Sequence, residues 1–500
     1  MNNSEDFVIV NHVLTKYRGR DKNIVIPDGV TSIGERAFDN RKSITSVTIP
    51  EGVTSIGRSA FFECSKLKSV TFPNSMKSIG ELAFCDCASL TRVTIPEGLS
   101  SIGKMAFNDC SSLVSITIPE SVTSIGLNAF FGCTSLTNVN IPCGVKSLDG
   151  TFGNCTSLAN ITIPEGVRRI DNYTFVGCTS LTNIIIPDSI KSIGRSAFCG
   201  CTNLTSVTIP EGVTSIGSSA FMHCEKLMEF FVADNNTEFK AIDGNLYSKN
   251  GDTFIAYAAG KTDESFTIPK YVSAISGGAF GSCTNLTNIT IPEGVTCIDE
   301  YTFCSCTNLT NITIPEGVTS IGSFAFNRCT GLTNIIIPES LTSIGMMAFV
   351  DCSGLTSITL PANTTNIDER AFLGCSSLTS ITLPVGVTSI ENRTFEKCES
   401  LTSVAIPEGV TIIDWGAFKD CSSLASVTIP STVTTIGSSA FEGCSSLKVL
   451  YYNGTNDDFK KINKRYNAYL NEIATYWYSE STPKRKGKYW HYVDGIATMW

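Results

Sequence analysis

The chain has 500 residues, of which 42% are hydrophobic and 17% charged, so it can bury a core and is not a disordered protein. Its net charge of −9 gives no general reason to expect nucleic acid as a partner. No apolar run reaches the roughly 20 residues that a bilayer-spanning helix needs, which excludes a membrane span.

The N-terminal end carries no recognisable export signal. The apolar run Phe7–Val10 is too short for the core of a signal peptide, and no lipidation motif closes the sequence. We therefore expect a cytoplasmic protein, with the cell surface or secretion by an unrecognised route as the alternative.

Residues 1–23 are expected to cap the segments that follow. Within them, Phe7–Tyr17 predicts a β-hairpin. Such a cover is needed because the end coil of a repeat protein would otherwise expose its apolar face and its strand edge.

From residue 24 onward, proline recurs at a fixed step. The step is 23 residues, apart from one step of 22 and one of 59. A period of this length indicates a solenoid, in which each unit packs against its neighbours. The seventeen repeat prolines are Pro27, Pro50, Pro73, Pro96, Pro119, Pro142, Pro164, Pro187, Pro210, Pro269, Pro292, Pro315, Pro338, Pro361, Pro384, Pro407 and Pro430.

Each repeat keeps its apolar residues at the same places. Counting the proline as position zero, they lie at −6, −3, −1, +3, +6, +10, +11 and +14. Apolar and polar residues alternate before the proline, which predicts a half-buried strand. The pattern from +3 to +6 predicts a second short extended segment. Glycine at +7 is expected to permit reversal into one helical turn. Phenylalanine fills +11 from Phe38 to Phe441, which predicts a stacked aromatic column.

Most of the 21 cysteines occupy one structural position. They stand at +14, or at +13 in the short coil, where a small thiol fits a buried turn and donates weakly to a carbonyl of the next coil. Parallel Cβ vectors in neighbouring coils are too far apart for good disulfide geometry. We expect a reduced ladder, consistent with a cytoplasmic location. Its members are Cys64, Cys87, Cys110, Cys133, Cys155, Cys178, Cys201, Cys224, Cys283, Cys306, Cys329, Cys352, Cys375, Cys398, Cys421 and Cys444.

Residues 225–268 interrupt the rhythm between repeat blocks 24–224 and 269–450. The stretch Phe239–Gly260 predicts a β-hairpin that turns at Asn250-Gly251. We expect a modified coil or side flap that joins the two blocks.

Residues 451–500 leave the repeat and are expected to form a small α+β cap. Asp457–Lys464 and Asn467–Ala474 predict short helices, whereas Thr475–Ser479 and Lys488–Val493 predict strands. Three of the four tryptophans lie in this segment, namely Trp477, Trp490 and Trp500.

The repeat resembles a known class of leucine-rich repeat. The motif L-x-x-[VI]-x-I-P-x-G-V-x-x-I-G-x-x-A-F-x-x-C covers residues 24 to about 450 and resembles the BspA-like bacterial and protozoan surface proteins, including the Treponema pallidum type. The resemblance implies an α/β fold: a right-handed, strand-rich solenoid with one short helical turn per coil. It also implies protein or host-surface binding, as in adhesins and surface antigens, without catalysis.

Two sets of residues depart from the repeat on the helical-turn face. Positions +8 and +9 are usually small or charged, yet two groups of neighbouring coils carry large apolar residues there. These are expected to meet as two apolar strips, either packed beneath a bulged turn or open to a protein partner. The candidates are Leu82, Met105 and Leu127, and then Tyr301, Phe324, Met346 and Met347.

Position +1 carries an acidic ladder. Carboxylates about one strand spacing apart repel modestly in water, so the ladder is either a solvated rim or a surface that steers a basic partner. The candidates are Glu51, Glu97, Glu120, Glu165, Asp188, Glu211, Glu293, Glu316 and Glu339.

Catalytic, metal and cofactor sites are not expected. The three histidines, His12, His223 and His491, are too scattered to form a dyad with a nucleophile. The Cys-x-Cys pairs lie in non-adjacent coils and cannot supply four ligands to one zinc ion. No glycine-rich phosphate loop follows a strand.

The sequence thus predicts a non-enzymatic scaffold that binds a protein or cell-surface ligand. The alternative is an adhesin-like carbohydrate or cell-wall binder that acts through the aromatic C-terminal module. That alternative rests on Gly487–Gly495, which resembles the aromatic wall-binding repeats of Gram-positive surface proteins.

Overall fold

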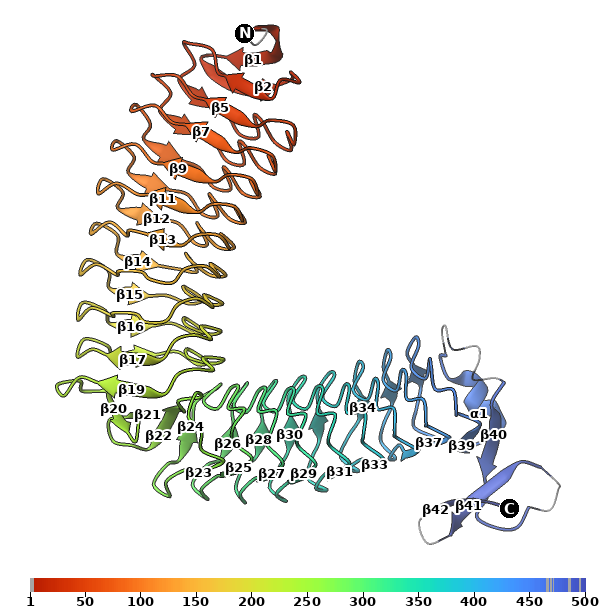
Figure 1. Ribbon diagram of the computed structural model, residues 1–500. Helices are drawn as coiled ribbons and strands as arrows, with labels where there is room; N and C mark the ends of the chain where they lie inside the picture. The colour runs from red at the N-terminus through yellow and green to blue at the C-terminus, as the bar shows by residue number, and fades with distance from the viewer. Residues whose placement is uncertain (1–3, 465–466, 468–469, 471, 484–486, 494–495) are drawn as a thin grey trace. The chain divides into compact units, whose positions relative to one another are not determined.

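The computed structural model describes residues 4–464, 467, 470, 472–483, 487–493 and 496–500. The chain divides into two compact units: Met1–Asn250 with Ala256–Lys261, and Gly251–Ile255 with Thr262–Trp500. Each unit is a stack of coils of about 23 residues with almost no helix (Figure 1), which confirms the expected leucine-rich repeat solenoid.

In unit 1, each coil adds a two-residue strand at +5 and +6, and most coils add one strand before their proline. The coils of Pro164 and Pro187 have only isolated β-bridges before the proline, at Thr162 and Ile185. Successive coils pair in parallel and in register, as in Ser46↔Ser69 and Ser55↔Ser78. The first ladder contains β3 Asn23–Val25, β5 Ser46–Thr48, β7 Ser69–Thr71, β9 Arg92–Thr94, β11 Ser115–Thr117, β13 Asn138–Val139, β17 Ser206–Ile209 and β19 Glu229–Val232; the second contains β4 Ser32–Ile33, β6 Ser55–Ile56, β8 Ser78–Ile79, β10 Ser101–Ile102, β12 Ser124–Ile125, β14 Ser147–Leu148, β15 Arg169–Ile170, β16 Ser192–Ile193 and β18 Ser215–Ile216.

The N-terminal hairpin imitates a coil. After the 3-10 turn η1 (Ser4–Asp6), β1 (Phe7–Val10) pairs antiparallel with β2 (Val13–Tyr17), and β2 pairs in parallel with β4. The ring of Tyr17 stacks on Phe38 at 5.2 Å, so the hairpin extends the aromatic column by one ring. The predicted hairpin cap is confirmed.

Unit 1 ends in the flap. Asn236 is buried and donates from Nδ2 to the carbonyls of Pro210 and Val213 at 2.8 and 3.0 Å, which fixes the flap to the last coil of the block. β20 (Phe239–Ile242) and β21 (Asn245–Ser248) form an antiparallel hairpin. The turn between these two strands is at Asp243-Gly244. The turn expected at Asn250-Gly251 lies between β21 and the next strand along the chain, β22 (Thr253–Ala256).

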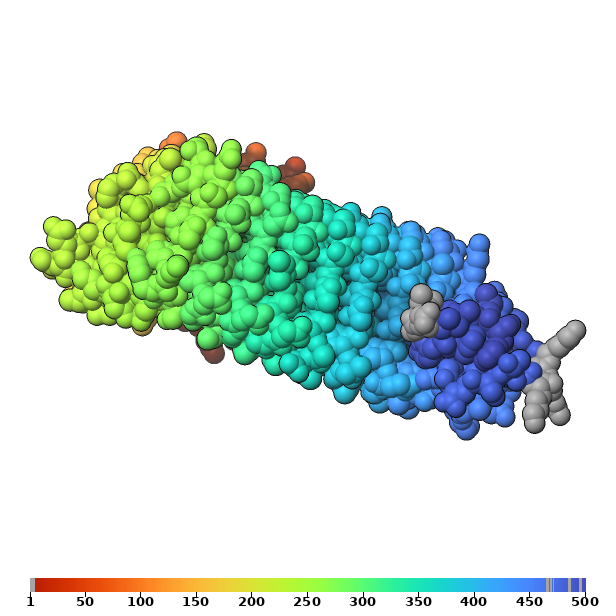
Figure 2. All heavy atoms as spheres, turned by 90° about the horizontal axis from the view of Figure 1, so that it is seen from below, coloured from red at the N-terminus to blue at the C-terminus, as the bar shows by residue number. Residues whose placement is uncertain are grey.

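Unit 2 repeats the two ladders, and Figure 2 shows its coils as side-by-side bands from green to blue. The first ladder contains β23 Ser265–Thr267, β25 Asn288–Thr290, β27 Asn311–Thr313, β29 Asn334–Ile336, β31 Ser357–Thr359, β33 Ser380–Thr382, β35 Ser403–Ala405 and β37 Ser426–Pro430. The second contains β22 Thr253–Ala256, β24 Ala274–Ile275, β26 Cys297–Ile298, β28 Ser320–Ile321, β30 Ser343–Ile344, β32 Asn366–Ile367, β34 Ser389–Ile390, β36 Ile412–Ile413 and β38 Thr435–Ile436.

An aromatic column and a thiol ladder fill the interior. Successive +11 ring centroids are 4.7 to 5.9 Å apart in unit 1 and 5.2 to 5.6 Å apart in unit 2. Fifteen of the sixteen +14 thiols donate to the +11 carbonyl of the preceding coil rather than the next one, as from Cys64 to Phe38 and from Cys306 to Phe280, at 3.2 and 3.0 Å. In the first coil, Arg41 takes this place and donates to the Tyr17 carbonyl.

The expected helical turn is a run of tight turns instead. In the coil of Pro50, the N–H groups of Ala60, Phe62 and Cys64 donate to carbonyls three residues earlier. Positions +9 and +13 have positive φ in every repeat coil, one position earlier in the short coil. Because a left-handed residue interrupts the segment at each of these two positions, the segment cannot form a helix.

Glycine at +7 serves close packing rather than reversal of the chain. A Cβ atom on Gly80 would lie 2.7 Å from the carbonyl oxygen of Ile56, and one on Gly103 would lie 2.5 Å from the carbonyl carbon of Gly80. Neither glycine has positive φ. The expectation for +7 was therefore wrong, because the left-handed residue is two positions later.

The C-terminal cap continues the first ladder. β39 (Val449–Asn453) pairs in parallel with β37, β40 (Ala474–Tyr478) with β39, and β41 (Tyr489–Val493) with β40; β42 (Ile496–Met499) closes the sheet antiparallel to β41. Helix α1 spans Asn456–Lys461 and overlaps the first helix expected there, Asp457–Lys464. The second expected helix, Asn467–Ala474, lies partly outside the described residues. No helix among the described residues is long and apolar enough to cross a membrane.

Candidate functional site

The turn face is held together by its own hydrogen-bond ladder. N–H groups at +9, +11 and +13 donate to carbonyls at +8, +10 and +12 of the next coil, as from Ser59 to Glu81 and from Phe61 to Ala83, each at 2.8 Å. Side chains at +9 in neighbouring coils are therefore held beside one another at about one strand spacing.

We call Tyr301, Phe324, Met346 and Met347 the aromatic strip. The rings of Tyr301 and Phe324 stack with centroids 4.8 Å apart and planes 5° apart. The N–H of Phe324 donates to the Met346 carbonyl at 3.0 Å, and the Met346 side chain is 37% exposed. The other three side chains are half-buried. Three consecutive coils thus bring these residues together at the surface of unit 2.

We call Leu82, Met105 and Leu127 the aliphatic strip. The N–H of Leu82 donates to the Lys104 carbonyl at 2.9 Å, and that of Met105 donates to the Leu127 carbonyl at 2.8 Å. All three strip side chains are half-buried. Since Leu127 stands at +8, with Asn128 in the left-handed position, the strip shifts sideways in its third coil.

The acidic ladder is exposed along its whole length, at Glu51, Glu97, Glu120, Glu165, Asp188, Glu211, Glu293, Glu316 and Glu339. Two of its members also bind the next coil. Glu51 accepts from the N–H of Asn74 at 3.1 Å, and Glu120 accepts from the N–H of Cys143 at 3.0 Å. Each contact is to a coil whose own +1 residue is not acidic, so no carboxylate on that side repels the glutamate.

The environment of the thiols favours their protonated form. All 21 cysteines are free. Burial raises the pKa of Cys64, Cys85 and Cys178 to about 12. The exposed Cys143 differs, because its hydrogen bond to the Glu120 carboxylate is what raises its pKa. Among the described residues, no group of three or more His, Cys, Asp or Glu side chains could hold a metal ion.

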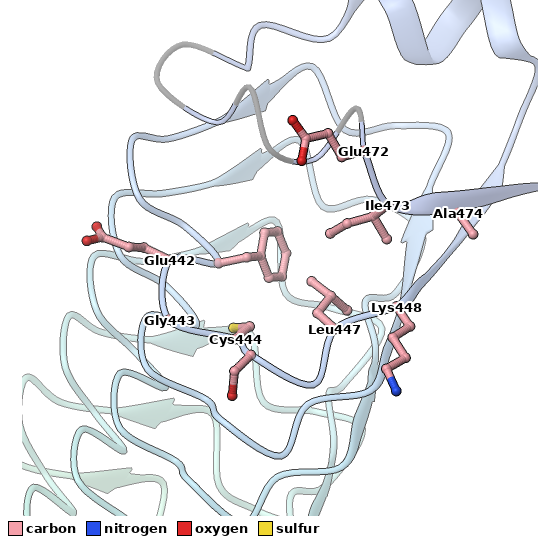
Figure 3. A pocket seen from close by; sticks show the side chains of 10 residues that line it. Glu442, Gly443, Cys444, Leu447, Lys448, Glu472, Ile473 and Ala474 are labelled. Carbon is pink, nitrogen blue, oxygen red and sulfur yellow. The ribbon is translucent and has the colours of Figure 1, made fainter.

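A cavity of about 590 Å³ lies over the last coil (Figure 3). Leu447 and Ile473 point toward each other across it, whereas the charged ends of Glu442, Glu472 and Lys448 point away from its interior. Its wall is therefore mostly apolar, with Leu447 and Ile473 at its centre.

The aromatic residues of the cap divide into core and surface. Trp490 is fully buried, and its Nε1 donates to the Tyr452 carbonyl at 3.1 Å. The rings of His491 and Trp500 stack at 3.7 Å, and Trp500 is 45% exposed. Within Gly487–Gly495, the last two residues lie outside the described part of the chain.

A family model described as the BspA type leucine rich repeat region, in six copies, matches residues 17–136, 132–249, 256–378 and 342–471. The chain belongs to this family. Comparison of this BspA-type protein with curated proteins found no match.

Several solved structures are similar to the BspA-type chain. A leucine-rich repeat protein from Bacteroides ovatus is 24% identical over 95% of this chain and 97% of its own, with a TM-score of 0.45. A leucine rich cell surface protein from Faecalibacterium prausnitzii is 29% identical over 93% of this chain and 95% of its own, with a TM-score of 0.39. The leucine rich repeat protein of Treponema pallidum is 29% identical over 41% of this chain and 90% of its own, with a TM-score of 0.33.

One group of residues in the cap has no counterpart among the sites expected from the sequence. Phe459, Lys464, Trp477 and Lys488 line a common cavity although they come from three separate segments. The lysines and aromatic residues that gather after residue 456 could have indicated a binding site. Only the packing of α1 against β40, however, shows that they line one cavity.

Proposed function

We propose that this BspA-type chain is a non-enzymatic scaffold that binds a protein partner through the aromatic strip. The observation that carries the proposal is the stacked pair of Tyr301 and Phe324, with Met346 exposed beside it. Contiguous apolar surface often marks a partner site, and aromatic residues dominate binding hot spots.

The backbone at the strip supports the same proposal. Tyr301, Phe324 and Met347 have φ of 58°, 58° and 57°. A left-handed conformation costs a bulky L-residue about 1–2 kcal/mol. Most other coils place serine, arginine, asparagine or glycine at +9, so the fold does not need large apolar side chains there. The apolar surface that these side chains form is therefore a better explanation for them than a requirement of the fold.

The test replaces Tyr301, Phe324 and Met347 with asparagine, which tolerates positive φ. We expect the variant to melt no lower than the wild type, and its affinity for a partner captured by the wild type to fall about tenfold or more. Unchanged affinity would show that the strip does not bind.

A matched control changes the same position elsewhere. Ser196→Asn and Ser439→Asn also occupy left-handed +9 positions, with φ of 51° and 58°, but lie outside both strips. Their affinity should equal that of the wild type. If these variants lose as much affinity as the strip variant, the loss comes from the turn itself.

We further propose that the acidic ladder steers a basic partner. Glu293, Glu316 and Glu339 stand in consecutive coils on unit 2 and are exposed. Replacing all three with glutamine should lower the association rate constant about tenfold at low ionic strength. The difference should vanish in high salt, where exposed charges are screened.

For location, we propose the cell surface. The family resemblance is to surface proteins, and the reduced thiols no longer favour the cytoplasm. Because burial raises their pKa, the ladder cysteines resist oxidation in either compartment. Protease treatment of intact native cells should digest the protein; survival until lysis would place it inside.

A second candidate function is carbohydrate or cell-wall binding through the cap, favoured by the stack of the half-buried His491 on the exposed Trp500. Because β39 belongs to the solenoid sheet, the full chain is the proper reagent. The wild type should sediment with peptidoglycan, whereas a His491→Ala/Trp500→Ala variant should stay in solution. Equal sedimentation of both would reject this candidate.

A further inference from the structure

A second cavity, of about 420 Å³, lies within the cap between α1 and β40. Phe459 and Lys460 face it from the helix, and Thr475 and Trp477, two residues apart on one face of the strand, face it from the other side. We call this cavity the basic cleft. Its size falls in the range of small-ligand sites, roughly 300–1,000 Å³.

The charge of the cleft opposes that of the whole chain. Lys460, Lys464 and Lys488 line it, and none of the described residues that line it carries a carboxylate. Residues 451–500 carry eight Lys and Arg against five Asp and Glu, a local surplus of three positive charges in a chain whose net charge is −9. Lys460 pairs with Asp457 at 3.1 Å, but both side chains are mostly exposed, so this pair is weak.

Lys464 is the distinctive residue of the cleft. Its Nζ lies 3.8 Å from the centroid of the Phe459 ring and donates to the Phe459 carbonyl at 2.8 Å. Burial lowers the pKa of this ammonium group, and no described carboxylate forms an ion pair with it. A partly buried cation without a counter-ion is unfavourable, and a bound anion would relieve that cost.

The aromatic wall is rigid. The indole of Trp477 packs edge-on against Tyr452 at 6.2 Å and against Phe459 at 5.8 Å, which holds its orientation. An aromatic face is a good platform for the C–H face of a sugar ring, and the neighbouring Thr475 hydroxyl can bond to a ring hydroxyl.

We propose that the basic cleft binds an anionic sugar. The ring packs on Trp477, and the charged group, a phosphate or a carboxylate, lies between the ammonium groups of Lys464 and Lys488, with Lys460 at the rim. This proposal does not depend on the aromatic strip, because the two sites share no residue.

The test titrates the full chain with glucose 6-phosphate, glucuronate, uncharged glucose and inorganic phosphate, followed by ligand-observed NMR. At least one charged sugar should bind about tenfold more tightly than both glucose and inorganic phosphate. Preference for one charged sugar identifies phosphate or carboxylate as the recognised group. If glucose or inorganic phosphate binds equally well, or a single-stranded oligonucleotide binds more tightly, the proposal is wrong.

Variants locate the binding. The double variant Lys464→Gln/Lys488→Gln should bind the preferred sugar about tenfold more weakly than the wild type, and Trp477→Phe should bind it severalfold more weakly. Lys461→Gln is the matched control, because Lys461 is on the same helix, pairs with Asp458 at 2.9 Å and does not line the cleft. It should leave affinity unchanged; equal losses in all three variants would contradict the proposal. An unchanged melting temperature establishes that the cap remains folded.

Discussion

At the residue scale, the ladder cysteines act as protonated donors. Cys64 and Cys178 donate to backbone carbonyls at 3.2 and 3.1 Å, and burial raises the pKa of each from 9.0 to about 12. Above pH 9.0 the unfolded chain loses thiol protons that the folded chain retains. Because the unfolded state then binds fewer protons, the free energy of unfolding falls as pH rises through this window.

We therefore predict alkaline destabilisation that depends on the ladder. In reducing buffer, the melting temperature should fall between about pH 8 and about pH 11. The melting temperature of a Cys64→Ser/Cys178→Ser variant should fall less over this range, because a serine hydroxyl donates to the same carbonyls and does not titrate there. An identical slope for both proteins would show that these thiols do not control the effect.

A second prediction concerns the left-handed +9 position. Arg370 has φ of 56° and lies outside both strips. Arg370→Gly should raise the free energy of unfolding by about 0.5–1 kcal/mol, since glycine avoids the left-handed cost but loses more chain entropy. Arg370→Val should lower it, because a β-branched residue is poorly suited to positive φ. Chemical denaturation measures both, and stabilisation by valine would refute the explanation.

The sequence predicted the buried positions well but not the backbone of the turn. Inward residues barely vary, so the phenylalanine column and the reduced thiols could be inferred from repetition alone. The left-handed positions could not be inferred, because residues as different as Arg36, Ser59 and Tyr301 occupy them. Hydrogen bonds between coils impose this conformation, and the side chains carry no common signature.

At the element scale, the N-terminal hairpin works by supplying one more ring. Tyr17 is fully buried between Phe7 and Phe38, at 5.1 and 5.2 Å. Tyr17→Ala should destabilise the hairpin by about 3–5 kcal/mol, and Tyr17→Phe by about 1 kcal/mol through loss of the hydroxyl contact to Asp21. Amide hydrogen exchange at β2 and β4 reports the difference. Equal exchange in wild type and Tyr17→Ala would mean that the ring does not secure the cap.

The C-terminal elements were predicted in part. α1, β40 and β41 fall close to the expected segments, whereas β42 was missed because Ile496–Met499 is a short strand at the chain end. The basic cleft was missed for another reason: it exists only where the faces of two elements meet. The aromatic strip could be anticipated because Tyr301, Phe324 and Met347 stand at +9 in adjacent coils, with Met346 beside them at +8.

At the scale of the whole molecule, stability should be a sum of contacts between neighbouring coils. Deleting residues 362–384 removes one full 23-residue period, so both ladders can rejoin in register. We expect unchanged circular dichroism and a modestly lower melting temperature. Deleting only 362–373 removes about half a period and should unfold unit 2 in part. Equal tolerance of both deletions would contradict register-dependent packing.

The central claim is that a protein partner is bound at the aromatic strip, and photo-crosslinking tests it most directly. Benzoylphenylalanine replaces Phe324 in one protein and Thr313, exposed in β27 of the same coil, in another. After irradiation in native extract, mass spectrometry should identify one protein partner crosslinked from position 324 and none from position 313. Crosslinks only from position 313, or equally from both positions, would contradict the account.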